Sequence, residues 1–126
     1  MTENDISTII VESAIEVHRE LGGPGLLESV YEEALIEELT TRRLQIERQL
    51  HVPIIYKGKH LATPLRLNLK VNGLVLVDNK AVSQWHPLFE AQMLTYLRLT
   101  RLKLGLVINF GERIVKNGIH RIANGL

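Results

Sequence analysis

Residues 75–82, VLVDNKAV, join the end of an apolar strand to a pair of opposite charges. Side chains two apart on a strand share a face, so Asp78 and Lys80 are expected to point the same way. By chance, about 0.7 acid-x-lysine spacings are expected in a chain with 14 acids and six lysines. The pair is therefore either part of a functional site or an exposed ion pair where a strand ends, which contributes little to stability.

The preceding strand decides what Asp78 can meet. Residues 65–71, LRLNLKV, alternate as a strand does, and the Asn72-Gly73 step that follows is a strong hairpin signal. A plain two-residue loop places Asn68 and Asp78 on opposite faces of the hairpin. A bulge, or a three-residue loop with its glycine in the left-handed conformation, places them on the same face. A site that contains both side chains therefore requires the odd loop.

The rest of the chain changes from helical to strand periodicity and back. Helical spacing of apolar residues predicts helices over 5–21, ending at Gly22-Gly23, over 26–41 and over 86–100. Period-two patterns and apolar runs predict strands from residue 44 with a turn at Lys57-Gly58, over 65–71, 74–82 and 103–110, and a closing hairpin around Asn117-Gly118. Pro53 indicates an edge strand or a bulge. The order α-α-β-β-β-α-β-(ββ) predicts a single α/β or α+β domain over residues 1–126, built around a mixed sheet.

Composition limits the classes of protein that the chain can belong to. The 126 residues include 45% apolar residues, enough for one core, and no cysteine, which excludes disulfides and thiolate metal sites. The formal net charge of +1 predicts no strong overall electric field. The first residues are polar and acidic, unlike a signal peptide, and no apolar run approaches the roughly 18 residues of a membrane span. We therefore expect a cytoplasmic domain that does not cross a membrane.

Several separated blocks resemble one family. Residues 25–31, GLLESVY, are similar to the signature of the GxxExxY family, which belongs to the PD-(D/E)XK nuclease-like superfamily. The likeness runs from about residue 9 to residue 122 and includes the blocks EVHRELG, GLLESVYEEAL, DNKAV, EAQMLTYLRLT and LKLGLVINF. It implies a restriction-endonuclease-like fold, with a mixed central sheet, an αβββαβ core and flanking helices.

The resemblance also implies a site for Mg²⁺ or Mn²⁺. Asp78 matches the acid of the acid-x-lysine element, Asn79 the backbone carbonyl donor, and Lys80 the lysine that orients the attacking water. Glu28 matches a helical glutamate that joins the metal site in many members. Gln92 and Tyr96 match a Gln-x-x-x-Tyr element that lies beside the site in some exonuclease-like branches, where it would contact the substrate. The implied catalytic residues are Lys80, Asp78, Glu28 and Gln92, and the implied metal ligands are Asp78, Glu28, Asn68 and Asn79.

The chain departs from the family pattern at three places. Asn68 stands where an Asp is expected, so the site has two carboxylates instead of three and should hold a hard cation more weakly. Asp78 is one methylene shorter than the glutamate usual at that place, and Phe89 replaces a frequent histidine. The asparagine belongs either to a natural member with reduced cleavage or to a chain altered to trap an inactive form.

Two functions follow from this pattern. The first is a metal-dependent nuclease acting on DNA or RNA, weakened or inactive because of Asn68. The second is a non-catalytic module that keeps the fold and binds nucleic acid or protein. A homodimer is expected in either case.

Several of these residues also have a purely structural alternative. Glu28 could simply favour the N-terminus of a helix, Tyr31 and Tyr96 could be core aromatics, and Gln92 could cap the end of a strand.

Overall fold

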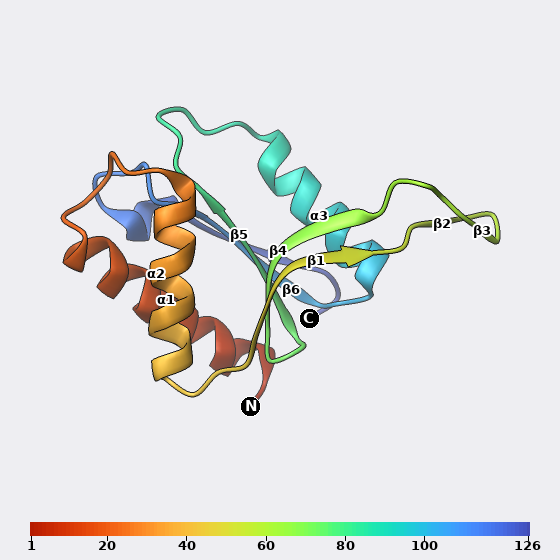
Figure 1. Ribbon diagram of the computed structural model, residues 1–126, viewed down its shortest axis with the longest axis horizontal. Coiled ribbons are helices and arrows are strands. Elements are labelled where there is room, and N and C mark those ends of the chain that lie inside the picture. The colour runs from red at the N-terminus through yellow and green to blue at the C-terminus, as the bar shows by residue number, and fades with distance from the viewer.

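Three α-helices, seven strands and one short 3-10 helix make up the computed structural model, which describes residues 1–126 (Figure 1). Their bounds are α1 Glu3–Glu20, α2 Glu28–Thr41, β1 Ile46–Val52, β2 Ile55–Tyr56, β3 Lys59–His60, β4 Leu65–Val71, β5 Val75–Lys80, α3 Leu88–Thr100, β6 Leu104–Asn109, η1 Val115–Gly118 and β7 Ile119–Ala123.

Five strands form one mixed sheet in the order β1-β4-β5-β6-β7. Strands β5 and β6 run parallel, and every other neighbouring pair runs antiparallel. Helices α1 and α2 cover one face of the sheet and α3 covers the other (Figure 1). The predicted mixed sheet with an αβββαβ core and flanking helices is confirmed.

Two apolar clusters hold these layers together. The larger contains 17 buried residues, mainly from α1, α2 and the sheet, with Tyr31 stacked on Phe110 at a ring distance of 4.7 Å. The smaller contains six buried residues between the sheet and α3, including Leu76 and Met93. Alternate residues of β5 therefore face different layers: Val75 and Val77 face α1 and α2, whereas Leu76 faces α3. Asp78 and Lys80 continue the α3-facing series.

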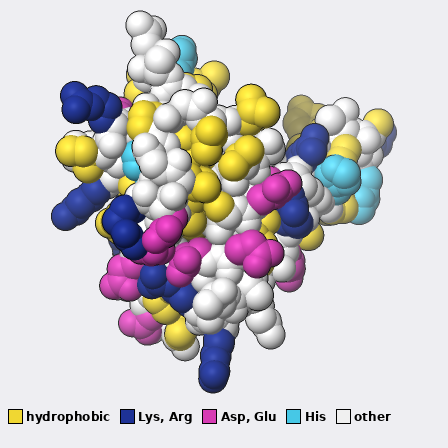
Figure 2. Space-filling view, turned by 60° about the vertical axis from the view of Figure 1, so that its left-hand side comes forward, with side chains coloured by type: hydrophobic (Ala, Val, Ile, Leu, Met, Phe, Trp, Pro, Cys, Tyr) yellow, Lys and Arg dark blue, Asp and Glu magenta, His cyan; other side chains and the backbone are white.

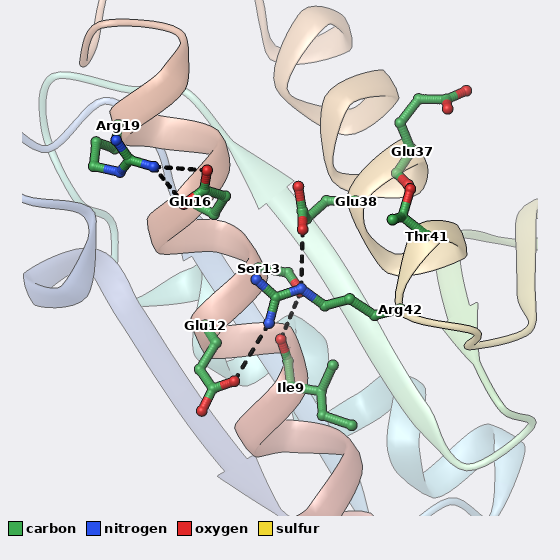
Figure 3. A network of polar contacts seen from close by, with 9 residues as sticks. All are labelled: Ile9, Glu12, Ser13, Glu16, Arg19, Glu37, Glu38, Thr41 and Arg42. Carbon is green, nitrogen blue, oxygen red and sulfur yellow. Dashed lines mark hydrogen bonds and ion pairs between the residues drawn. The ribbon is translucent and has the colours of Figure 1, made fainter.

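Polar contacts join α1 to α2 at their outer surfaces (Figure 3). Arg42, just after α2, donates to Glu38 on its own helix at 2.9 Å and to Glu12 on α1 at 3.3 Å. Helix α1 begins with a capping box, in which Thr2 and Asp5 satisfy each other's backbone N–H groups, and it gives way to Gly22-Gly23 as the sequence predicts. These two helices thus form a unit that packs as one layer.

The loop between β4 and β5 has the odd length that the site requires. Val71 pairs with Val75, so residues 72–74 form the loop, and Asn72 and Gly73 both adopt positive φ angles of 50° and 67°. Backbone pairing of the two strands reaches Leu69–Val77. The next two residues along, Asn68 and Asp78, therefore share a face, as a three-residue loop was predicted to arrange.

Two predictions at the hairpins need correction. The predicted closing hairpin around Asn117-Gly118 is wrong: residues 115–118 form η1, and only β7 follows it to pair with β6. The physical reason is the burial of Val115 in the larger cluster, which a strand at this position would not achieve. The turn at Lys57-Gly58 is confirmed, but it joins β2 to β3, a ribbon separate from the sheet. Strand β1 instead pairs with β4 and lies at the edge of the sheet, as Pro53 suggested.

None of the three α-helices combines the length and the apolar character that a bilayer crossing requires.

The left-handed conformation of Gly73 gives a test of the loop. A Cβ at Gly73 would meet no atom within 4 Å, so Gly73→Ala changes only the backbone preference at a φ of 67°. We expect a loss of about 1–2 kcal/mol in the free energy of unfolding, measured by urea titration. Lys70→Ala in the same hairpin is the control, because Lys70 makes only a long surface ion pair with Glu47, at 3.8 Å. Equal stability of the two variants would contradict the assigned loop.

Candidate functional site

A pocket of about 200 Å³ opens between β4, β5, the start of α2 and α3. Six of the seven residues predicted for the site line it, and they come from four different elements. These residues are Glu28 from α2, Asn68 from β4, Asp78 and Lys80 from β5, and Gln92 and Tyr96 from α3. The structure thus brings together side chains that lie up to 68 positions apart in the chain.

Asn68 and Asp78 form the shortest polar contact in the pocket. The Asn68 Nδ2 donates to Asp78 Oδ1 at 2.6 Å. The amide must present its NH₂ group to this oxygen, because an ionised carboxylate only accepts hydrogen bonds. An aspartate at position 68 could not make this contact without a proton or a cation between the two carboxylates. The asparagine therefore satisfies Asp78 with no added charge.

Lys80 engages the other oxygen of Asp78. Its Nζ lies 3.3 Å from Asp78 Oδ2 and 4.5 Å from the centre of the Phe89 ring. A ring face attracts an ammonium group, so Phe89 contributes to fixing the lysine in place. The ion pair is largely buried, with side-chain exposures of 19% for Lys80 and 11% for Asp78. The interpretation of this pair as an exposed surface contact is therefore wrong.

Burial sets the protonation of the two carboxylates. Desolvation raises the pKa of Asp78 above its ordinary value, while Lys80 and the hydrogen bond from Asn68 act in the opposite direction. Desolvation also raises the pKa of Glu28; Lys80 opposes this shift and the charge of Asp78 adds to it. Burial, followed by the charge of Asp78, raises the pKa of the Tyr96 hydroxyl. The pocket is therefore a place where additional positive charge is favourable.

Within residues 25–31, GLLESVY, the hydroxyl of Tyr31 holds the loop before α2 in place. The hydroxyl of Tyr31 donates to the carbonyl of Gly23 at 2.7 Å and accepts from the N–H of Leu26 at 3.2 Å. These bonds tie down the loop before α2, in which Gly25 has a φ of 113°. Helix α2 then begins at Glu28, which lines the pocket. Tyr31 is thus a buried core aromatic, as its structural alternative stated, and its hydroxyl fixes the segment that carries Glu28.

Asn79 differs from the other predicted residues. Its side chain is 1% exposed, is absent from the pocket lining, and has both polar atoms buried without a hydrogen-bond partner. An unsatisfied buried amide costs about 1–3 kcal/mol. The side chain therefore takes no part in the pocket, and a role for Asn79 through its backbone carbonyl stays a prediction.

Three polar residues beside the pocket were not predicted as site residues. Arg66 lines the pocket and donates to Gln49 Oε1 at 2.9 Å, and Gln49 Nε2 donates to the buried Glu32 at 3.1 Å. Gln49 interrupts β1 with a φ of 51° and faces Asn68 without pairing to it. Arg66 shares a face with Asn68 in the sequence pattern, which was a usable signal. Gln49 and Glu32 lie on separate elements, so no local sequence pattern predicts their contact.

The fold and the site together define a nuclease-like α/β domain with an acid-x-lysine element on a central strand. A sequence model described as the PD-(D/E)XK nuclease superfamily matches residues 4–122, nearly the whole chain, and the chain belongs to that superfamily. Comparison with curated proteins and with solved structures gives no significant match.

Members of this superfamily generally use divalent metal ions, and the residues in the pocket fit such an ion with a reduced donor set. Asp78 and Glu28 supply carboxylate oxygens in a desolvated pocket, where burial raises the pKa of both groups. The amide oxygen of Asn68 is a neutral donor of the hard type that Mg²⁺ accepts. No three His, Cys, Asp or Glu side chains lie together in a group able to hold an ion. The pocket thus offers a divalent ion two carboxylates, from Asp78 and Glu28, and one neutral amide oxygen, from Asn68.

The raised pKa of Asp78 predicts a pH dependence of stability. The folded protein keeps the Asp78 proton at pH values where the unfolded chain has lost it, so stability falls as the pH rises from the unfolded pKa through the folded one. Asp78→Asn removes this titration. Urea unfolding from about pH 3.5 to pH 8 should show wild type losing stability relative to the variant as the pH rises. A difference that is flat, or that changes in the opposite direction, would contradict the assignment.

Tyr31→Phe tests the anchoring of the loop before α2. The ring and its stacking on Phe110 remain, but the bonds to Gly23 and Leu26 are lost. We expect the free energy of unfolding to fall by about 1–2 kcal/mol, with faster hydrogen exchange of the Leu26 amide. The control is Tyr56→Phe, at an exposed tyrosine of the β2-β3 ribbon. Unchanged exchange at Leu26 would show that the hydroxyl does not hold the loop.

Proposed function

We propose that this chain is a nuclease-type domain of the GxxExxY kind that hydrolyses phosphodiester bonds in nucleic acid, with a weakened metal site. The observation that supports this proposal is the convergence of Glu28, Asn68, Asp78, Lys80, Gln92 and Tyr96 on one pocket. A structural ion pair would need only Asp78 and Lys80. A surrounding set of hard oxygen donors and hydrogen-bonding side chains is what phosphodiester hydrolysis requires.

In this proposal, each side chain has a distinct role. Asp78 and Glu28, with the oxygen of Asn68 and the backbone carbonyl of Asn79, would hold Mg²⁺ or Mn²⁺. The bound ion would supply charge neutralisation at the phosphate and a lower pKa for an attacking water. Lys80, kept beside Asp78 by the 3.3 Å contact, orients that water and stabilises developing negative charge.

Helix α3 supplies the proposed substrate contacts. Gln92 and Tyr96 lie four residues apart on this helix, so both side chains face the pocket. An amide and a phenol can each donate a hydrogen bond to a phosphate oxygen, and a phenol ring can also stack on a base. The two residues therefore suit binding of the strand next to the scissile bond.

A second function, a non-catalytic module that binds nucleic acid or protein, is favoured by the contacts of Asp78. Both of its oxygens have partners in the protein, Asn68 at 2.6 Å and Lys80 at 3.3 Å. To become a ligand, the Asn68 oxygen would have to turn toward the ion, which breaks the first of these contacts. The absence of a third carboxylate also lowers the affinity of the pocket for a hard cation. The homodimer and the cytoplasmic location expected from the sequence stay predictions.

Asn68→Asp separates the two functions. The variant adds the third carboxylate and removes the amide donor, so the Mn²⁺ affinity measured by calorimetry should rise about tenfold or more. Cleavage of labelled single- and double-stranded DNA and RNA should appear or increase in the same variant.

Asn117→Asp is the matched control, because it makes the same charge change at an exposed position on η1. Its Mn²⁺ affinity and cleavage should equal those of the wild type. If Asn68→Asp binds Mn²⁺ no better and cleaves nothing, the nuclease proposal fails and the binding module remains.

A further inference from the structure

The β2-β3 ribbon stands away from the rest of the molecule (Figure 1). The segment that carries this ribbon, residues 53–64, is called the arm. Of its residues, only Ile54 is not exposed; it packs against the smaller apolar cluster and anchors the base of the arm. Pro53 and Pro64 are the first and last residues of the arm and stiffen its connections to β1 and β4, since proline fixes the backbone φ angle.

The arm exposes apolar surface that the protein itself does not cover. Ile55 and Tyr56 are each 59% exposed and Leu61 is 45% exposed. The ribbon holds only two pairs of residues, Ile55 with His60 and Tyr56 with Lys59. Such a short hairpin gains little stability from its own contacts. Large exposed side chains on a projecting hairpin are typical of a surface that binds a partner.

The distribution of charge indicates which kind of partner suits the arm. The net charge of +1 conceals a division, since residues 1–41 contain ten acids and one arginine, whereas residues 48–77 contain no acid. The acid-free stretch carries five basic residues and two histidines, namely Arg48, Lys57, Lys59, Arg66, Lys70, His51 and His60. Figure 2 shows acidic side chains gathered on the α1–α2 side and the arm projecting at the right. A polyanion complements the arm and is repelled by the helical side.

The arm is continuous with the pocket. Arg66 lines the pocket, and His51 lies opposite it on the neighbouring strand β1. From Arg66 the chain runs back along β4 into the arm, reaching Lys59 seven residues earlier. At about 3.3 Å per residue, this path is at most roughly 23 Å long. That is the length of about six or seven nucleotide steps.

We propose that the arm binds the phosphate backbone of a nucleic acid whose adjoining segment enters the pocket. Lys57 and Lys59 contact phosphates, and Tyr56 packs on the sugars or bases between them. A two-stranded ribbon fits the major groove of a duplex, and the same lysines suit a single strand. This inference rests on the proposed nucleic-acid substrate, but it assigns a binding element that lies outside the pocket.

The test compares the full chain with the double variant Lys57→Ala, Lys59→Ala. The probes are a fluorescent 20-base-pair DNA duplex and a 20-nucleotide single strand, in EDTA so that no cleavage occurs. Anisotropy is measured from 50 to 200 mM salt. Loss of two phosphate contacts should weaken binding about tenfold and lower the slope of log affinity against log salt by about 2. The probe with the larger loss identifies whether the arm prefers duplex or single strand.

The matched control is Arg113→Ala, Lys116→Ala, which removes the same charge from exposed positions at and before η1. It should leave the affinity and the salt slope near those of the wild type. Equal losses in the two double variants would overturn the proposal, because net charge alone would then explain the binding. A wild-type dimer that becomes monomeric on Ile55→Ser, Tyr56→Ser, with nucleic-acid binding unchanged, would also overturn it and make the arm a self-association element.

The outcomes separate the arm from the proposed activity. If the Lys57→Ala, Lys59→Ala variant binds nucleic acid more weakly, but neither wild type nor Asn68→Asp cleaves it, the arm proposal is supported and the nuclease proposal is contradicted. If Asn68→Asp cleaves nucleic acid, but the arm variant binds it as well as the Arg113→Ala, Lys116→Ala control does, the nuclease proposal is supported and the arm proposal is overturned. If wild type binds neither probe, the arm proposal is overturned.

Discussion

The site depends on the register between β4 and β5. One extra residue in the loop at 72–74 pairs Val71 with Val75, and that shift brings Asn68 to the same face as Asp78. With a two-residue loop, Val71 would pair with Leu74 and Asn68 with Val77, so Asn68 would face the layer of α1 and α2 instead of Asp78. The loop needs two consecutive left-handed residues, and asparagine and glycine tolerate that conformation best. A backbone preference at the tip of the hairpin thus determines which polar side chains meet about ten ångströms or more away, at its open end.

At that open end, the difference between an amide and a carboxylate decides the electrostatics of the pocket. The Asn68 amide donates to Asp78, and Lys80 pairs with the second oxygen, so the buried acid is compensated from both sides. Two carboxylates in the same geometry would repel each other and would need a cation or a shared proton. Side-chain identity at one position therefore separates a pocket that is satisfied by the protein alone from one that demands an ion.

Local signals in the sequence predicted much of this arrangement. Glycine doublets, apolar periodicity and the Asn72-Gly73 step gave the helix end after α1, the order of the main elements and the condition on the hairpin loop. Features that depend on distant contacts were missed or misassigned. Val115 takes the 3-10 conformation because it packs into a cluster drawn from both halves of the chain, and Gln49 bridges Arg66 to Glu32 across three elements. The family resemblance supplied the pocket residues, which periodicity alone could not bring together.

The uneven placement of charge has a kinetic meaning. Ten of the 14 acids lie within residues 1–41 with only one arginine, whereas the rest of the chain carries 14 basic side chains and four acids. Acidic charge is therefore concentrated on the side of α1 and α2, and basic charge on the rest of the molecule. A body with this separation carries a large dipole moment even when its net charge is close to zero. In the field of a polyanion it experiences a torque that turns the sheet and the arm forward before contact. Fewer encounters are then wasted in wrong orientations, and raising the ionic strength removes that advantage.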